Sequence, residues 1–197
     1  MIRGFHLADW FTLGNAACGT GSLFSTISYV QSGNARHLYL AGGLVFLAFI
    51  FDVFDGKIAR WRRTHSAMGR ELDSLADVIS FGVAPAIMGY GCGMQGLYDR
   101  LILGYFVACG VSRLARFNVT AEKLSGDSGK VAYFEGTPIP TSAIVVAILL
   151  AGVYLGSIGD NLWFGEIRFE AHALHPLALL FAISGSLMIS RFRIPKL

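Results

Sequence analysis

Residues 51–82 read FDVFDGKIARWRRTHSAMGRELDSLADVISFG, and they hold four acids at regular spacing: Asp52, Asp55, Asp73 and Asp77. The first two are three positions apart and the last two are four apart, so each pair lies on one face of a helix. A short turn at about 63–69 lets the two helices run antiparallel. The spacing therefore predicts that four carboxylates from two helices converge.

The surrounding chain is unusually apolar. It has 197 residues, of which 54% are hydrophobic and 15% charged, whereas a soluble domain carries about 25% charged residues. Four uncharged segments approach the roughly 20 residues that span a bilayer, and two shorter ones run into segments with spaced charges. These patterns predict an all-α polytopic membrane protein that forms a single domain over residues 1–197. Its one bundle would have six transmembrane helices, at about 11–30, 38–62, 70–92, 98–120, 140–158 and 172–192. A short interfacial helix is expected within residues 1–10, where Phe5 and Trp10 can dip into the membrane.

Basic residues indicate the orientation of these spans. Thirteen of the 16 Lys and Arg residues fall at the N-terminus, the 57–70 turn, the 113–130 connection and the C-terminus. The positive-inside rule then places both termini and the four aspartates at the cytoplasmic face of an inner membrane. No basic strip interleaved with aromatic residues is present, so a nucleic-acid partner is not expected.

Four acids in such a bundle need compensating charge. One acid at the centre of a membrane helix costs roughly 2.5–3.5 kcal/mol, and neighbouring carboxylates repel one another. Bound divalent cations resolve both problems, and ligands that are all oxygen favour Mg²⁺, Mn²⁺ or Ca²⁺ over zinc. Ion pairs with the basic residues of the same stretch are the alternative. A carboxylate-held metal pair beside basic residues is typical of phosphoryl transfer.

Eight residues of the stretch carry a family resemblance: Asp52, Asp55, Gly56, Ala59, Arg60, Gly69, Asp73 and Asp77 match D-x2-D-G-x2-A-R-x8-G-x3-D-x3-D at every fixed position. This pattern resembles the signature of the CDP-alcohol phosphotransferases, a family of six-helix membrane enzymes. Residues 71–85 and 113–119 resemble its serine-using branch. Residues 134–140 resemble that branch's G-L-P-x-P loop, with Thr137 in place of the leucine.

The resemblance implies a role for each matched residue. Asp52, Asp55, Asp73 and Asp77 would bind Mg²⁺ or Mn²⁺, with two cations expected, and Asp77 would also be the catalytic base. The CDP group would be held by Gly56, Ala59, Arg60 and Gly69, together with a T-x2-N pair, Thr12 and Asn15. The implied reaction transfers the phosphatidyl group of CDP-diacylglycerol to L-serine, within membrane lipid and in a homodimer. Gly42, Gly43, Gly152 and Gly156 are candidates for the helix interface of that dimer.

The acceptor site is expected near residues 113–118. Arg113 and Arg116 are three apart, and the bidentate arginine fork suits the carboxylate of serine. Asn118 is a candidate for reading its amino group or hydroxyl. Two alternatives stay open for the arginines: they anchor the helix at lipid headgroups, or they grip a phosphate, which would admit glycerol 3-phosphate or inositol phosphate as acceptor. Inositol is a further alternative acceptor. A divalent-cation transporter is the alternative of another class.

Overall fold

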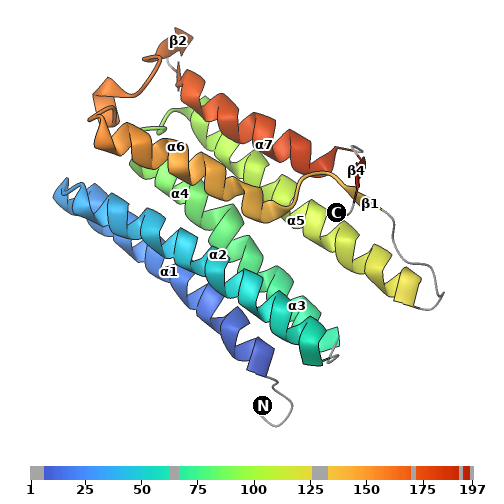
Figure 1. The fold of residues 1–197 in the computed structure, drawn as a ribbon. Coiled ribbons are helices and arrows are strands. Elements are labelled where there is room, and N and C mark those ends of the chain that lie inside the picture. The colour runs from blue at the N-terminus through green and yellow to red at the C-terminus, as the bar shows by residue number, and fades with distance from the viewer. Residues whose placement is uncertain (1–6, 63–66, 126–132, 170–171, 191–192, 196–197) are drawn as a thin grey trace.

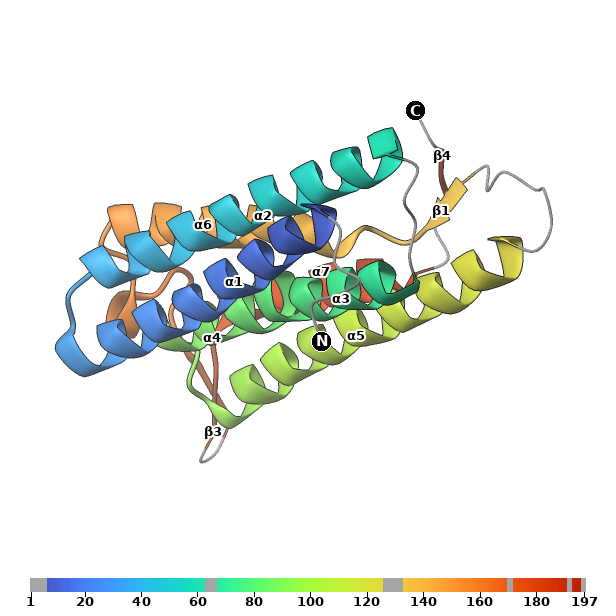
Figure 2. The ribbon, with the colours of Figure 1, turned by 90° about the horizontal axis from the view of Figure 1, so that it is seen from below.

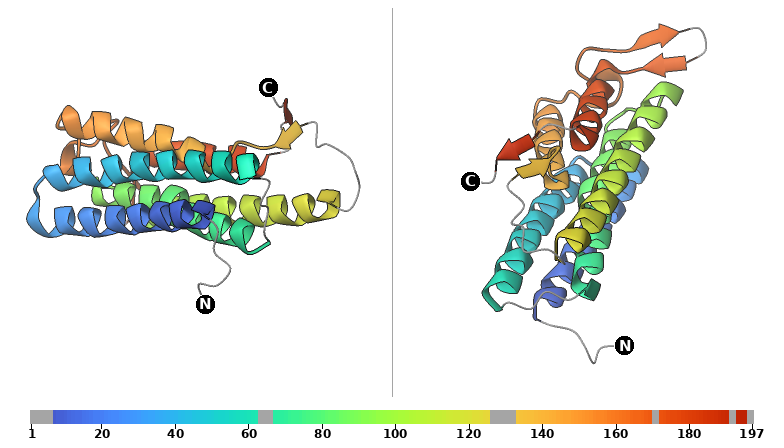
Figure 3. Two further views of the ribbon diagram at one scale, coloured as in Figure 1. Left: turned by 60° about the horizontal axis from the view of Figure 1, so that its bottom comes forward. Right: turned by 90° about the vertical axis from the view of Figure 1, so that its right-hand side faces the viewer.

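The computed structural model describes residues 7–62, 67–125, 133–169, 172–190 and 193–195. These residues form one helical bundle in which successive rods run in opposite directions (Figures 1 and 3). The helices are α1 (Leu7–Ser32), α2 (Arg36–Arg62), α3 (Ala67–Asp77), α4 (Ala84–Gly91), α5 (Leu97–Ser125), α6 (Ser142–Tyr154) and α7 (Leu179–Ile189). A π-helical segment, Val78–Val83, joins α3 and α4 into one rod, and short 3₁₀ turns at Ile139–Thr141 and Pro176–Ala178 lead into α6 and α7.

The helical fold predicted from the sequence is confirmed. The described residues contain six rods, each at one of the six predicted positions. Two stretches, Arg36–Ile58 and Met68–Gly91, are long and apolar enough to cross a bilayer, while Ile139–Tyr154 and Pro176–Ile189 are shorter apolar helices. The crossing of a membrane by all six rods stays a prediction.

The ends of the bundle differ from the predicted pattern. Strand β1 (Tyr133–Glu135) pairs antiparallel with β4 (Arg193–Pro195), and β2 (Ile167–Phe169) pairs with β3 (His172–Leu174). The prediction that the last helix begins at residue 172 is therefore wrong. Its first turn begins at Pro176, because proline lacks the N–H that a helix interior needs and fits the first turn instead.

In the residues that the structure describes, the predicted interfacial helix is part of α1 and not a separate helix. Residues 7–10 form the first turn of α1, which continues without a break to Ser32. Asp9 in this turn is buried, whereas Trp10 is exposed. A helix lying in the interface would keep the acid in water, so this turn belongs to the bundle. Residues 1–6 lie outside the described residues.

The connection between α1 and α2 is encoded by two residues. Gly33 adopts the left-handed conformation with φ 68°, which costs glycine no steric penalty, and its N–H donates to the Tyr29 carbonyl at 2.7 Å. Asn34 then caps α2, because its Oδ1 accepts the Arg36 N–H at 3.1 Å. This tight turn makes α1 and α2 pack along each other (Figure 2).

The π-helical segment follows from a proline. Pro85 has no N–H to donate to the preceding turn, and the Ala84 N–H bonds to the Ile79 carbonyl five positions back instead of four. The wider turn keeps the rod continuous through the proline. It begins directly after Asp77, so it also sets the rotation of the residues that follow that aspartate.

The core lies along the bundle axis, and the outer faces remain apolar. Phe106 and Phe181 meet edge to face with ring centroids 5.2 Å apart. Facing outward, Phe24, Leu101 and Ile144 are each more than 60% exposed, as expected where the surrounding solvent is lipid. The three cysteines, Cys18, Cys92 and Cys109, are free and buried, so they serve as small core residues.

Candidate active site

The four aspartates meet at one end of the bundle. Asp52 and Asp55 lie one turn apart on α2, and Asp73 and Asp77 lie one turn apart on α3. One carboxylate oxygen each from Asp52, Asp55 and Asp73 lie within 4.8 Å of one another. Asp55 and Asp77 are buried, and the other two are half-buried. The tertiary structure thus brings the two helical pairs into one cluster, as their spacing predicted.

The first helix supplies polar partners for two of these acids. Thr12 Oγ1 donates to Asp55 Oδ2 at 2.9 Å, and Asn15 Nδ2 donates to Asp77 Oδ1 at 3.1 Å. Thr12 and Asn15 are three positions apart, so one face of α1 serves both carboxylates. The structure therefore places both residues of the predicted T-x2-N pair at the cluster.

A second contact fixes α1 against the π-helical turn. Ser80 Oγ donates to the Asn15 carbonyl at 2.9 Å. Gly19 permits this approach, because a Cβ atom there would lie 2.3 Å from Ser80 Oγ and 2.8 Å from Ser80 Cα. Sequence reasoning missed Ser80. The available signal was its position three residues after Asp77 in an otherwise apolar segment.

The two arginines of α5 lie in different surroundings. The Arg113 guanidinium interacts electrostatically with Asp52, Asp73 and Asp77 and lies 5.5 Å from the centroid of the Phe117 ring. Arg116 instead reaches the end of α7, where its Nη1 lies 3.5 Å from the Ile189 carbonyl. The predicted pair is therefore divided, with Arg113 facing the aspartates.

Asn118 is bound to α3. Its Nδ2 lies 3.0 Å from Ser74 Oγ and 3.3 Å from Glu71 Oε1, and the Ser74 hydroxyl lies 3.3 Å from Asn118 Oδ1. Ser74 and Glu71 were not identified as site residues from the sequence. They lie on the same helix as Asp73, one turn from one another, and this spacing was the available signal. The three side chains couple α5 to the helix that carries Asp73 and Asp77.

Small residues leave space beside the cluster. A Cβ atom added at Gly56 would meet nothing within 4 Å, so the surface of α2 next to Asp55 is open. Gly69 lies in the first turns of α3 and is half-buried. Ala59 and Arg60 belong to the last turns of α2, but their side chains are outside the described part of the structure.

The donor set of the cluster fits a divalent cation. All three convergent groups are carboxylates, the ligands that hard cations prefer. Asp73 Oδ1 is buried and has no hydrogen-bond partner among the described residues, although a buried charged oxygen normally requires one. A cation coordinated by Asp52, Asp55 and Asp73 would satisfy this oxygen and relieve the repulsion between the three acids.

The protein is a helical bundle that carries a carboxylate cluster on α2 and α3. Its N-terminal helix hydrogen-bonds to one acid of each of these two helices. The chain belongs to the CDP-alcohol phosphatidyltransferase family, whose sequence profile matches residues 5–184. Together with the two membrane-capable helices, this membership indicates a membrane protein.

Three relatives that are named for their activities indicate which members of the family this chain resembles. The chain is 44% identical to a CDP-diacylglycerol–serine O-phosphatidyltransferase of Saccharomyces cerevisiae, over all of this chain and 72% of that protein. It is 34% identical to the enzyme of the same name from Helicobacter pylori, over 94% of this chain and 70% of that protein. It is also 40% identical to an archaetidylserine synthase of Methanothermobacter thermautotrophicus, over 75% of this chain and 59% of that protein. The first two relatives are named for serine as a substrate, and the third for a lipid product that contains serine.

Proposed function

We propose that this protein transfers the phosphatidyl group of CDP-diacylglycerol to L-serine, forming phosphatidylserine and CMP. The observation that carries the proposal is the convergence of Asp52, Asp55 and Asp73 in a chain 44% identical to a CDP-diacylglycerol–serine O-phosphatidyltransferase. Other acceptors would leave this cluster unchanged, so the acceptor is inferred from the relatives and from α5.

CDP-diacylglycerol would bind with its pyrophosphate at the cluster and its acyl chains in lipid. Open space at Gly56 gives the CDP group room beside Asp55, and Gly69, Ala59 and Arg60 would complete that side of the site. Thr12 and Asn15 hold Asp55 and Asp77 in place. Mg²⁺ or Mn²⁺, one or two ions held by Asp52, Asp55 and Asp73 with Asp77 close by, would neutralise charge on the phosphate oxygens.

Asp77 would act as the general base. It is the most buried of the four acids together with Asp55, and Asn15 fixes one of its oxygens. In the proposed step Asp77 takes the proton of the serine hydroxyl, whose oxygen forms a bond to the phosphorus that carries diacylglycerol. The bond from that phosphorus to the CMP oxygen breaks, and CMP leaves with the electron pair. Positioning of the base within hydrogen-bond reach is the main requirement for this transfer.

Arg113 is the residue of α5 best placed to hold the serine carboxylate. Its guanidinium already faces the acidic cluster, so an acceptor bound to it would lie beside Asp77. Asn118 would fix α5 against α3 through its contacts with Ser74 and Glu71. Arg116 would hold α5 against the end of α7. A phosphate on the acceptor would use the same guanidinium, which is why the acceptor must be tested directly.

The proposal includes six membrane-spanning rods with the aspartates and both chain ends at the cytoplasmic face. The alternating direction of the rods (Figure 3) and the concentration of basic residues at this end support it. A homodimer is also proposed. Gly43 and Gly156 have open space around them, whereas Gly42 packs on Leu150 of the same chain and would not contribute to the interface.

The test offers one labelled CDP-diacylglycerol to the purified protein with serine, glycerol 3-phosphate, inositol phosphate and inositol in parallel. The expected result is release of CMP and a lipid product only with serine. A product with another acceptor would overturn the serine assignment and leave the reaction class intact. Divalent-cation uptake by proteoliposomes without CMP release would instead favour the transporter alternative.

A further inference from the structure

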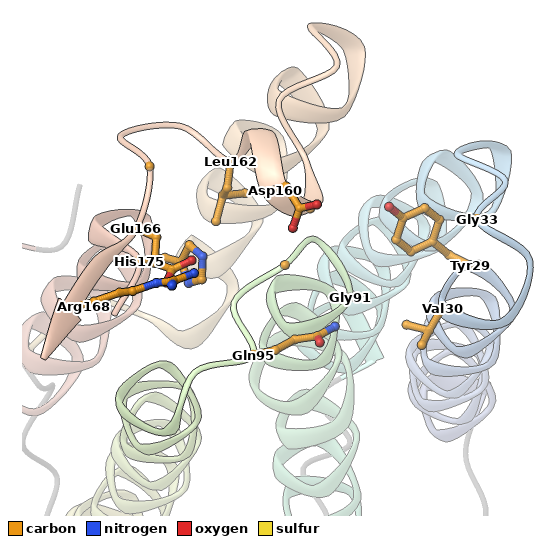
Figure 4. A pocket seen from close by; sticks show the side chains of 13 residues that line it. Tyr29, Val30, Gly33, Gly91, Gln95, Asp160, Leu162, Glu166, Arg168 and His175 are labelled. Atoms are coloured by element: carbon orange, nitrogen blue, oxygen red, sulfur yellow. The ribbon is translucent and has the colours of Figure 1, made fainter. Parts of the chain in front are cut away.

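A polar cavity of about 510 Å³ lies at the end of the bundle opposite the aspartates. It lies between the last turn of α1, the loop that follows α4 and the segment 159–168 (Figure 4). Tyr29 on its wall is about 26 Å from Thr12 along α1, at 1.5 Å per residue. The cavity is therefore too far from the cluster to belong to the reaction site.

A buried acid fixes the histidine of this cavity. Asp99 is fully buried, and its two oxygens accept the N–H groups of His175 at 2.8 Å and Gly96 at 3.0 Å. His175 Nδ1 lies 2.6 Å from Asp99 Oδ2, so the buried carboxylate fixes the orientation of the imidazole ring at the wall of the cavity.

The other charged groups of the cavity are arranged on two sides. Figure 4 shows Glu166 and Arg168 beside His175 on one wall, with Asp160 apart from them. The hydrogen bond from Arg168 lowers the pKa of the Glu166 carboxyl, which keeps it ionised. This ion pair is exposed and contributes little to stability, so a ligand can replace either partner. The C-terminal ends of α1 and α4 also favour a cation here.

We propose that this cavity binds the phosphoethanolamine headgroup of a membrane phospholipid. The primary ammonium would lie between the carboxylates of Asp160 and Glu166, and the phosphate would contact Arg168. A quaternary ammonium has no N–H to donate to these carboxylates, and a serine headgroup would bring a third carboxylate against two acids. The chemistry of the cavity thus selects ethanolamine among common headgroups.

Apolar side chains around the cavity favour a lipid over a soluble phosphoamine. Val30 lines the cavity and is 52% exposed, and Phe164, next to the lining residue Gly165, is 78% exposed, so both would lie against acyl chains. The lipid assignment rests on the proposed membrane-spanning bundle, which puts this end at the headgroups of the other leaflet. The preference for an ammonium and a phosphate rests on the cavity alone.

The test is native mass spectrometry of the full chain in detergent with equimolar phosphatidylethanolamine, phosphatidylcholine and phosphatidylglycerol of identical acyl chains. One phosphatidylethanolamine should be retained over the others by about tenfold, the effect of one charge-assisted hydrogen bond. Equal retention of the three lipids would overturn the proposal.

Variants locate the bound headgroup. Asp160→Asn combined with Glu166→Gln should abolish the preference for the ammonium lipid, and Arg168→Gln should weaken retention of phosphatidylethanolamine about tenfold. Arg36→Gln is the matched control, because Arg36 is exposed at the start of α2 and does not line the cavity. An unchanged preference in the acid double variant would refute the site.

Two further measurements distinguish a membrane lipid from a soluble phosphoamine as the ligand, and test the headgroup site independently of the proposed transferase activity. Soluble glycerophosphoethanolamine at equal concentration should not displace the lipid, and equal competition would overturn the lipid assignment. Phosphatidylserine formation should stay within about twofold of wild type in all these variants, because the cavity lies about 26 Å from the cluster. A wild-type protein without transferase activity that still selects phosphatidylethanolamine would refute only the proposed function.

Discussion

The side-chain amide of Asn15 donates a hydrogen bond to Asp77 at 3.1 Å, joining α1 to α3 across 62 positions of the chain. The same residue accepts a bond from Ser80 at its backbone carbonyl, 2.9 Å away. The side chain and the backbone of Asn15 are thus both hydrogen-bonded to the rod that contains Asp77 and Ser80. Its own Oδ1 is buried without a hydrogen-bond partner among the described residues, which leaves an acceptor beside the proposed base.

Substitution of Asn15 by alanine should release Asp77 from its fixed position. We expect kcat/KM for phosphatidylserine formation to fall about 10²-fold, since a displacement of about 1 Å at a reacting group has that effect. Ser28→Ala is the control on the same helix, where the hydroxyl bonds the Phe24 carbonyl at 3.0 Å. Equal activity of the two variants would contradict the role given to Asn15.

Asp77→Asn should remove the proposed base while keeping its shape and its bond partner. Turnover should fall by about 10²–10⁴-fold, the range that a general base contributes, and binding of CDP-diacylglycerol should persist. Single-turnover CMP release measures the first, and equilibrium binding of labelled substrate measures the second. If the variant turns over at the wild-type rate, another residue takes the proton.

Removal of divalent cations should stop the reaction. Incubation with a chelator is expected to abolish CMP release, and added Mg²⁺ or Mn²⁺ should restore it. Asp73→Asn should raise the cation concentration for half-maximal activity by about tenfold or more, because one of three convergent carboxylates is lost. Asp160→Asn, at the far end of the bundle, is the control. Full activity after exhaustive chelation would exclude the proposed metal role.

Arg113→Lys should impair serine binding more than CDP-diacylglycerol binding. Lysine keeps the charge but loses the bidentate fork, so we expect KM for serine to rise about tenfold with a smaller change in KM for the lipid. Arg100→Lys is the matched control, because Arg100 is exposed at the start of α5. A larger effect on the lipid KM would reassign Arg113 to the pyrophosphate.

Gly19→Ala should separate α1 from the π-helical turn. The new methyl group would lie 2.8 Å from the Ser80 Cα, and overpacking of this kind costs about 1–3 kcal/mol. Gly104→Ala, on α5, is the matched control, since nothing lies within 4 Å of its added Cβ and helix propensity gains up to about 1 kcal/mol. Melting temperatures in detergent should therefore shift in opposite directions. A similar shift for both would show that Ser80 moves freely.

Local patterns in the sequence were sufficient to predict the rods and the convergence of the acids. The uncharged stretches locate six helices, and three- and four-residue spacings place each aspartate pair on one helix face. A short connection between two helices then forces an antiparallel pair. Each of these inferences depends on one continuous segment of the chain or on one short turn, and such relations are readable along the chain.

Tertiary packing decided which neighbours each acid has. Asn15 and Asp77 are far apart in sequence, and only the packing of α1 on the α3–α4 rod makes them partners. The division of Arg113 from Arg116 has the same origin, because α7 lies beside one of them. The spacing of side chains along α5 does not distinguish Arg113 from Arg116. A contact between helices depends on how each rod is rotated, and that rotation is set jointly by the buried side chains of all the rods.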